Sequence, residues 1–236
     1  MISAAPRPIP AVRRSPKALV VTVVTVALAI VALLAGPPAT AQTAAGPCTL
    51  VPLGGEGPWD YRSQNPRVKA METFHFTPKV EALLSGQGGV SIAIDLEFVL
   101  RYSPNHHRAL DAFVRLADRE KTTQPREAKF TAQCHFERAV GYRPDDAVAR
   151  MMFANYLLKH GEEAFGLHHL VIAKEQQADN PFTQYNVGMV YAESGKYDLA
   201  LEQAHKAQAL GFPRTELRDK LRAAGRWRDP PASAPQ

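Results

Sequence analysis

The sequence predicts an all-α protein, an α-solenoid of antiparallel helix pairs that follows an irregular N-terminal segment. Two observations predict this fold class. Residues 147–213 repeat themselves with a period of 34 positions, which is the size of one helical hairpin in some repeat proteins. In addition, 45% of the residues are hydrophobic and 22% are charged, a composition that can build a core and excludes a wholly disordered chain.

The first 41 residues are typical of an export signal. Basic residues extend to Lys17, an uncharged apolar run covers residues 18–35, and Ala39-Thr40-Ala41 forms a small-residue cleavage site. We therefore expect cleavage after Ala41 and export to the periplasm or cell envelope. The alternative is an uncleaved anchor in the inner membrane, because 18 apolar residues are near the lower limit for crossing a bilayer. In both cases the positive charge before the run places the rest of the chain outside.

The excess of basic residues belongs largely to this signal. The chain has 28 Lys and Arg against 23 Asp and Glu, but Arg7, Arg13, Arg14 and Lys17 lie within the signal, which has no acidic residue. The part that folds is therefore almost neutral. Since a nucleic-acid binder needs a basic surface on its folded part, we expect no nucleic-acid partner.

Cys48 and Cys134 are the two cysteines of the chain, and both follow the signal. In an oxidising compartment, one disulfide between them is the simplest expectation. Cys134 lies two residues from Ala132 and two from Phe136, which we place on the inner face of a helix. We therefore expect its thiol to be exposed on the convex side of the array. The bond would fasten residues 42–72, which we expect to be irregular, to the back of the array.

The internal repeat is clearest in the last two units. A shift of 34 residues superposes the small residues Ala154 and Gly166 on Gly188 and Ala200. Small residues at these places let two antiparallel helices approach closely, and Gly195 supplies the turn between them. The other superposed pairs are Phe153 with Val187, Leu157 with Tyr191, Gly161 with Gly195, and Ala173 with Ala207.

The second copy carries the family resemblance. Its pattern, Val187-Gly188-x-x-Tyr191-x-x-x-Gly195-x-Tyr197-x-x-Ala200-x-x-x-Ala204-x-x-Ala207, resembles the tetratricopeptide repeat, whose period is 34. The resemblance covers residues 73–213 and implies a superhelical array. It divides the array into a degenerate repeat at 73–106 and better repeats at 107–146, 147–180 and 181–213.

The two earlier repeats depart from the regular period. Pro104 and Pro144 close successive repeats but are 40 positions apart, so six extra residues fall in the polar stretch 119–127, which we expect to be a solvated loop. In the degenerate repeat, Thr77-Pro78 begins a shortened first helix as its N-cap and first turn. Residues 86–89, Gly-Gln-Gly-Gly, separate that helix from the second one.

The array is expected to end in a solvating cap helix within residues 214–228, which places Leu217 and Leu221 on one face. Residues 229–236 are rich in Pro and Ala and are expected to be a tail. Short segments at 57–62, 75–78, 104–109 and 142–146 also resemble a group of exported bacterial repeat proteins. The partners of that group are generally unassigned, so this second resemblance adds little about function.

The family resemblance implies where a partner would bind. Tetratricopeptide proteins hold peptides or partner helices on the concave surface, which their first helices line. The candidate partner-binding residues are then Arg108, Asp111, Arg115, Met151, Asn155, Tyr185, Asn186 and Met189. The first three make one end charged. The concave positions of the two later repeats also include Val148, Leu158, Phe182 and Ala192, so the other end is expected to be apolar with adaptable Met side chains. The resemblance thus implies a non-catalytic interaction or scaffold module with a protein or peptide partner.

Some family members clamp a terminal carboxylate on this surface, and Asn155, Asn186 and Lys220 fall on matching positions. The match is incomplete, because Met151 and Glu216 stand where that clamp carries lysines. A site for an extended peptide or a helix therefore fits better. The alternative is that the two asparagines only bond across neighbouring helices.

The search for catalytic motifs finds neither a G-x-S-x-G elbow, nor a phosphate-binding loop, nor an H-E-x-x-H helix. His106-His107 and His168-His169 are adjacent pairs, and adjacent helical residues cannot both face one metal. We place the first pair in a helix cap as solvated side chains. We therefore expect no enzyme activity, no cofactor and no metal. The remaining alternatives are a membrane-anchored envelope assembly factor and a His-dependent metal-binding enzyme.

Aromatic residues gather before the first good helix, at Trp59, Tyr61, Phe74 and Phe76. We expect them to pack over the exposed end of the array. The alternative is a strap that occupies the chain's own groove.

Overall fold

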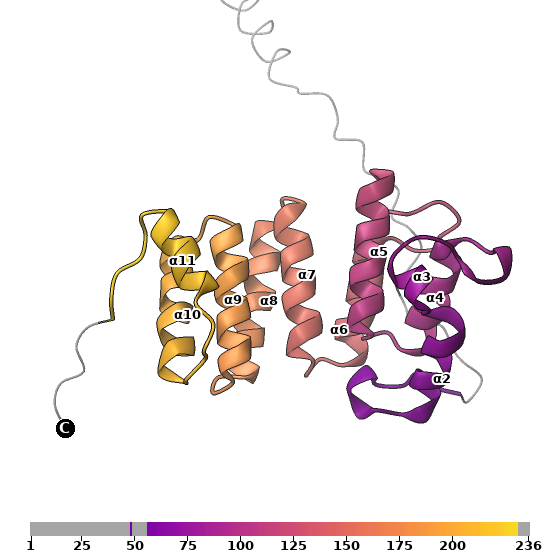
Figure 1. Cartoon of the computed structure of the whole chain (residues 1–236), viewed down its shortest axis with the longest axis horizontal. Helices are drawn as coiled ribbons and strands as arrows, with labels where there is room; N and C mark the ends of the chain where they lie inside the picture. Colours follow the sequence, from indigo (N-terminus) through magenta and orange to yellow (C-terminus); the bar gives the residue numbers. More distant parts are fainter. Residues whose placement is uncertain (1–47, 49–55, 231–236) are drawn as a thin grey trace, which may run out of the picture. The chain divides into compact units, whose positions relative to one another are not determined.

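The computed structural model describes residue 48 and residues 56–230, and every regular element in this part of the chain is a helix (Figure 1). This confirms the all-α prediction. The α-helices are α2 (Pro66–His75), α3 (Pro78–Glu81), α4 (Ile92–Tyr102), α5 (His107–Glu120), α6 (Ala132–Tyr142), α7 (Ala147–Lys159), α8 (Glu163–Gln176), α9 (Pro181–Glu193), α10 (Tyr197–Ala209) and α11 (Glu216–Ala223). Two short 3-10 helices, Tyr61–Ser63 and Gln87–Gly89, precede α2 and α4.

The predicted export signal at 1–41 and the last six residues lie outside the described part. Within the described part, no helix is long and apolar enough to cross a membrane.

Helices α7 to α10 form two closely packed antiparallel pairs, as the 34-residue period predicts. Figure 1 shows α7 to α11 standing side by side, and α7 with α8 and α9 with α10 make the most extensive contacts in the described chain. Gly161 and Gly195 adopt φ angles of 82° and 72° in the turns within the pairs, a left-handed conformation that glycine adopts without strain. The predicted turn at Gly195 is therefore confirmed.

The predicted close contacts also lie where the repeat places them. A Cβ atom on Gly166 would lie 3.1 Å from the carbonyl oxygen of Ala154, across the α7–α8 pair. A Cβ atom on Gly188 would lie 3.4 Å from the carbonyl oxygen of Ala200 and only 2.5 Å from Leu217 Cδ2. The two repeats thus make the same contact with glycine and alanine exchanged, which confirms the alignment of the last two units.

The six-residue insertion changes the packing of the preceding unit. α5 ends at Glu120, residues 121–131 form a mostly exposed loop, and α6 then packs more on α7 than on α5. The rings of Phe136 and Phe153 stack with centroids 5.4 Å apart and join α6 to α7. α7 contributes to two buried clusters, one toward α5 and α6 and the other toward α9.

The N-terminal part is more helical than expected. Residues 66–75 lie in a region that we expected to be irregular or to precede the first helix, but they form α2. Asn65 caps this helix by accepting a hydrogen bond from the Arg67 N–H, and Pro66 occupies its first turn, which are ordinary helix-start signals. α3 begins at Thr77-Pro78 as predicted, and residues 86–89 separate it from α4.

The predicted disulfide joins Cys48 to Cys134, whose Cα atoms are 5.2 Å apart. The expected exposure of Cys134 is wrong, because this residue is fully buried. The bond fastens the start of the described chain to α6.

Candidate binding groove

Three elements converge on a groove in the C-terminal half of the array. It has a volume of about 460 Å³ and lies between α7, α9 and the start of α11. Its lining residues are Val148, Met151, Met152, Asn155, Phe182, Tyr185, Asn186, Met189, Val190, Glu193, Arg214 and Glu216. Five of the eight predicted partner-binding residues, Met151, Asn155, Tyr185, Asn186 and Met189, are therefore brought together.

The floor of the groove is apolar. Met151 and Tyr185 are 5% and 6% exposed, so they present only part of their surface to the groove. Phe182 is half exposed, and Met189 is half-buried. Unbranched Met side chains adapt to irregular apolar ligands, so this floor suits an apolar side chain from a partner.

The two asparagines do not bond across neighbouring helices, which excludes the purely structural alternative in the described structure. The Asn186 amide donates to the Phe182 carbonyl of its own helix over 2.7 Å. Its side-chain oxygen accepts no hydrogen bond from a described residue, and the Asn155 side chain makes no hydrogen bond with one. Both residues are half-buried and line the groove, so they present amide groups that could bond to a partner's main chain.

The carboxylate clamp is not assembled. Lys220 lies 3.5 Å from Glu193 Oε1, and Glu216 accepts a hydrogen bond of 3.1 Å from the Tyr185 hydroxyl. Burial and the Glu216 carboxylate raise the pKa of Tyr185, so its hydroxyl stays protonated at neutral pH. Glu216 therefore places an acidic group where a clamp would carry a lysine, and Lys220, which falls on a matching clamp position, lies beside the Glu193 carboxylate.

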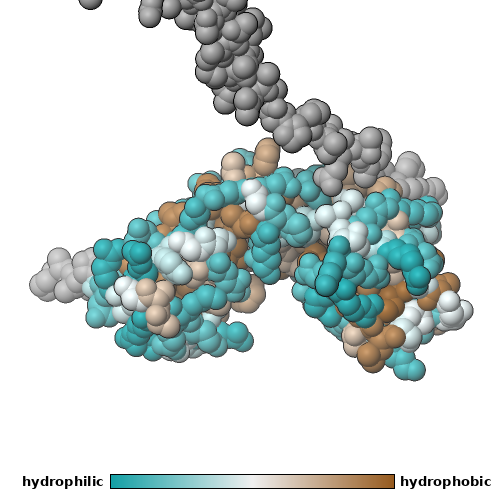
Figure 2. Space-filling view, turned by 90° about the horizontal axis from the view of Figure 1, so that it is seen from above, coloured by the Kyte–Doolittle hydropathy of each residue, from teal (hydrophilic) through white to brown (hydrophobic). Residues whose placement is uncertain are grey.

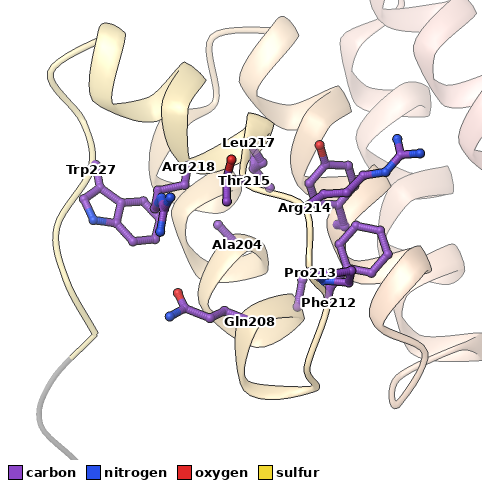
Figure 3. Close-up of a pocket in the computed structure, with 11 residues that line it drawn as sticks. Ala204, Gln208, Phe212, Pro213, Arg214, Thr215, Leu217, Arg218 and Trp227 are labelled. Atoms are coloured by element: carbon purple, nitrogen blue, oxygen red, sulfur yellow. The ribbon is translucent and has the colours of Figure 1, made fainter.

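A smaller hollow of about 160 Å³ adjoins this region (Figure 3). Phe212 and Arg214 lie on its side nearest α9, and Trp227 lies at its other end. The Phe212 ring packs 4.5 Å from the ring of Tyr185. Tyr185 and Arg214 line both hollows, so the loop between α10 and α11 forms part of the wall that supports the groove.

The three charged candidates on α5 do not line the groove. Arg108 donates a 2.8 Å hydrogen bond from Nε to Glu81 and holds the pKa of that carboxyl below its usual range. Arg115 bonds to Asp111 and to the Glu81 carbonyl, over 2.7 and 3.0 Å. α3 therefore covers part of the α5 surface that we expected to bind a partner. The repeat register does not show this because it gives the spacing of the helices and not the path that a shortened helix takes.

The segment with Trp59 and Tyr61 does not occupy the groove either. Trp59 stacks on Tyr102 at 5.5 Å, Tyr61 packs 4.2 Å from the His106 ring, and Phe76 is buried. The segment therefore packs against the array, but where α4 ends and α5 begins rather than over the exposed end that we expected. Phe74 differs, since it is 67% exposed.

The histidine pair at 106–107 is structural rather than solvated. His106 is fully buried and caps α5: its Nδ1 accepts from the Ala109 N–H at 3.1 Å, and its Nε2 lies 3.0 Å from Glu72. His107 Nε2 lies 2.8 Å from Asp146. The described residues contain no group of three or more His, Cys, Asp or Glu placed to hold a metal.

Several groove residues were missing from the predicted set. The repeat register places Val148 and Phe182 at concave positions, but neither was among the eight candidate residues. Met152 and Val190 lie one position further along α7 and α9 than Met151 and Met189. Glu193 and Arg214 come from a helix end and a loop, for which the repeat pattern gives no signal.

A scan against known protein families finds no match for this chain, and a search of curated proteins finds no significant relative.

Proposed function

We propose that this chain is a non-catalytic protein-interaction module of the tetratricopeptide type, which holds a peptide or partner helix in the groove between α7, α9 and α11. The observation that carries the proposal is the convergence of apolar side chains and amide groups from successive first helices on one groove. Apolar anchors and main-chain bonds are the two means by which such surfaces bind helices and peptides.

The groove favours a partner with apolar anchors and a basic flank. Met189 and Phe182 offer contact area for one or two apolar side chains, and Asn155 and Asn186 offer amide groups to polar atoms. Glu193, Glu216 and Arg214 are the charged residues of the lining, so the lining carries an excess of one negative charge, and Lys220 lies outside it beside Glu193. An amphipathic helix with Leu- or Met-type anchors and a nearby Lys or Arg matches these features.

The proposed site of action is the periplasm or cell envelope. The support is the signal-like segment at 1–41 together with the Cys48–Cys134 disulfide, since disulfides persist in oxidising compartments. If the chain is not cleaved after Ala41, the apolar run at 18–35 would anchor the same module in the inner membrane, facing outward. N-terminal sequencing of the exported protein separates the two forms.

Site-directed photocrosslinking in the intact envelope tests the proposal. A photoreactive residue at Asn155 or Asn186 should give a defined protein adduct, whereas one at the exposed Glu175 of α8 or Lys206 of α10 should not. Met189→Glu should abolish the adduct because it places a charge on the apolar floor. Equal adducts at groove and control positions, or adducts insensitive to Met189→Glu, would contradict the proposal.

A further inference from the structure

A second pocket lies on the N-terminal half of the array, on helices that do not line the groove. It has a volume of about 380 Å³, within the range of small-molecule sites. Its described lining comes from α4, α6 and the loop between α5 and α6. The lining residues are Ile94, Glu97, Phe98, Arg101, Glu127, Lys129, Phe130 and Arg138.

Most of the pocket surface is apolar. Ile94 and Phe98 lie one helical turn apart on α4 and remain 42% and 38% exposed, so both present apolar surface at the pocket. Phe130 contributes a third apolar wall from the loop. Figure 2 shows apolar surface gathered over this half of the array, at the right of the view.

Arg138 is the unusual group in this wall. It is only 3% exposed, and its Nε and Nη2 atoms are buried and have no hydrogen-bond partner among the residues that the structure describes. Its guanidinium lies 4.7 Å from the centre of the Phe130 ring. A buried cation without a bonded anion is costly. Burial lowers the pKa of Arg138, and the charge of Arg101 adds to this effect, while the charge of Glu97 opposes it.

The nearest acidic group does not pair with Arg138. The Glu97 carboxylate accepts hydrogen bonds of 2.9 Å from the N–H groups of Lys129 and Phe130, and it lies 3.3 Å from His135 Nε2. These bonds commit Glu97 to fixing the loop against α4 and α6. Arg101 and Lys129 add positive charge to the pocket, which Glu127 offsets only in part.

We infer that this pocket binds a small organic carboxylate with an apolar body, whose carboxylate pairs with Arg138 while its body lies against Ile94, Phe98 and Phe130. A carboxylate supplies the two acceptors that a guanidinium binds best. Because Nε and Nη2 are buried in the wall, binding includes a rotation of the Arg138 side chain that turns this edge toward the ligand. The exposed Arg101 at the same pocket assists as a second cation.

Titration of the full chain with octanoate and with phenylacetate tests the inference, since one has an alkyl body and the other an aryl body. NMR of the arginine side chains should show saturable movement of the Arg138 Nε–H signal with at least one of the two acids. The acid that binds more tightly shows whether the pocket prefers an alkyl or an aryl group. The matched alcohols, octanol and phenylethanol, should bind about tenfold more weakly because they lack the charge.

Arg138→Met provides the matched variant. It removes the unpaired charge but keeps most of the volume, so it should fold at least as stably as the parent chain. Its affinity for the preferred acid should fall about tenfold, while Arg222→Gln, at an exposed arginine on α11, should leave the affinity unchanged. Absence of a saturable Arg138 shift with both acids in the parent chain, or equal binding by acid and alcohol, would overturn the inference. Unchanged affinity in Arg138→Met would do the same.

Discussion

Asn105 donates a hydrogen bond of 2.8 Å from its side-chain amide to the carboxylate of Asp146, and both residues are fully buried. The two residues belong to the loops that start α5 and α7. The same Asn105 amide donates to Asp60 over 2.8 Å, and the Asn105 oxygen accepts from the Tyr61 N–H. One amide side chain thus ties the N-terminal segment to the starts of two successive first helices.

Asp146→Ala should therefore destabilise the fold strongly. Asp146 caps α7 by accepting from the Ala149 N–H at 3.1 Å, and it also bonds His107 and Asn105. Loss of a cap plus two buried bonds should lower the free energy of unfolding by about 2–4 kcal/mol. The control is its neighbour Asp145, which is exposed and pairs with Arg62 and Arg143. Asp145→Ala should cost below about 1 kcal/mol in urea unfolding, and equal losses would refute this account of the loop.

Acidification should destabilise the protein partly through His106. Burial, together with the charge of Arg108, lowers the pKa of His106 to about 3, below its ordinary value of about 6.5. The folded state thus favours the neutral ring, whose Nδ1 caps α5. Its contribution to stability is complete above pH 6.5 and declines as the pH falls from there toward 3.

The measurement is the free energy of unfolding between pH 7 and pH 5, above the range where most carboxylates titrate. His106→Asn keeps a neutral capping side chain. It should reduce the slope of the free energy of unfolding against pH, by at most about 1.4 kcal/mol per pH unit. The exposed His168→Asn serves as the control and should leave the slope unchanged. If His106→Asn has the parent slope, the ring is not the group that titrates.

Gly188→Leu should unfold the last repeat. A side chain there would meet Leu217 and Gln203 within 3.1 Å, so the substitution should lower stability by about 1–3 kcal/mol or more. Gly141 is a matched control because it is also helical but has no atom within 4 Å of the added Cβ. A thermal midpoint that drops equally in Gly188→Leu and Gly141→Leu would show that helix contact is not the cause.

Removal of the disulfide should destabilise the chain. The bond joins two cysteines that are 86 positions apart in the sequence. For a loop of this length, the loss of chain entropy in the unfolded state predicts a stabilisation of about 4–5 kcal/mol. Unreduced, alkylated protein should show no alkylated cysteine by mass spectrometry, and Cys48→Ser with Cys134→Ser should unfold at lower urea concentration. Two alkylated cysteines in the exported monomer, or a disulfide dimer through Cys134, would contradict the pairing.

Much of the fold could be predicted because the repeat fixes local contacts. Only small residues fit where two helices touch, as at Gly188 and Ala200, and the turns at Gly161 and Gly195 need a left-handed backbone. The 34-residue period brings these positions out of the sequence. The disulfide followed from the presence of only two cysteines.

The misses have physical causes. α2 begins with Asn65-Pro66, but its apolar face is too weak to stand out from the sequence. The cover of α5 by Glu81 depends on the path of a shortened helix, and the burial of His106 depends on packing from Tyr61 and Phe76, which are distant in sequence. The Arg138 pocket similarly depends on where an inserted loop folds back on α4.

The central claim is that the groove of α7, α9 and α11 is the partner-binding surface. The most direct test is the affinity of the crosslinked partner, once purified, for the full chain and for Asn155→Ala with Met189→Ala. We predict a loss of about tenfold or more, with helical circular dichroism and thermal midpoint close to the parent. Undiminished affinity in a variant that remains folded would contradict the claim and exclude the groove as the main binding surface.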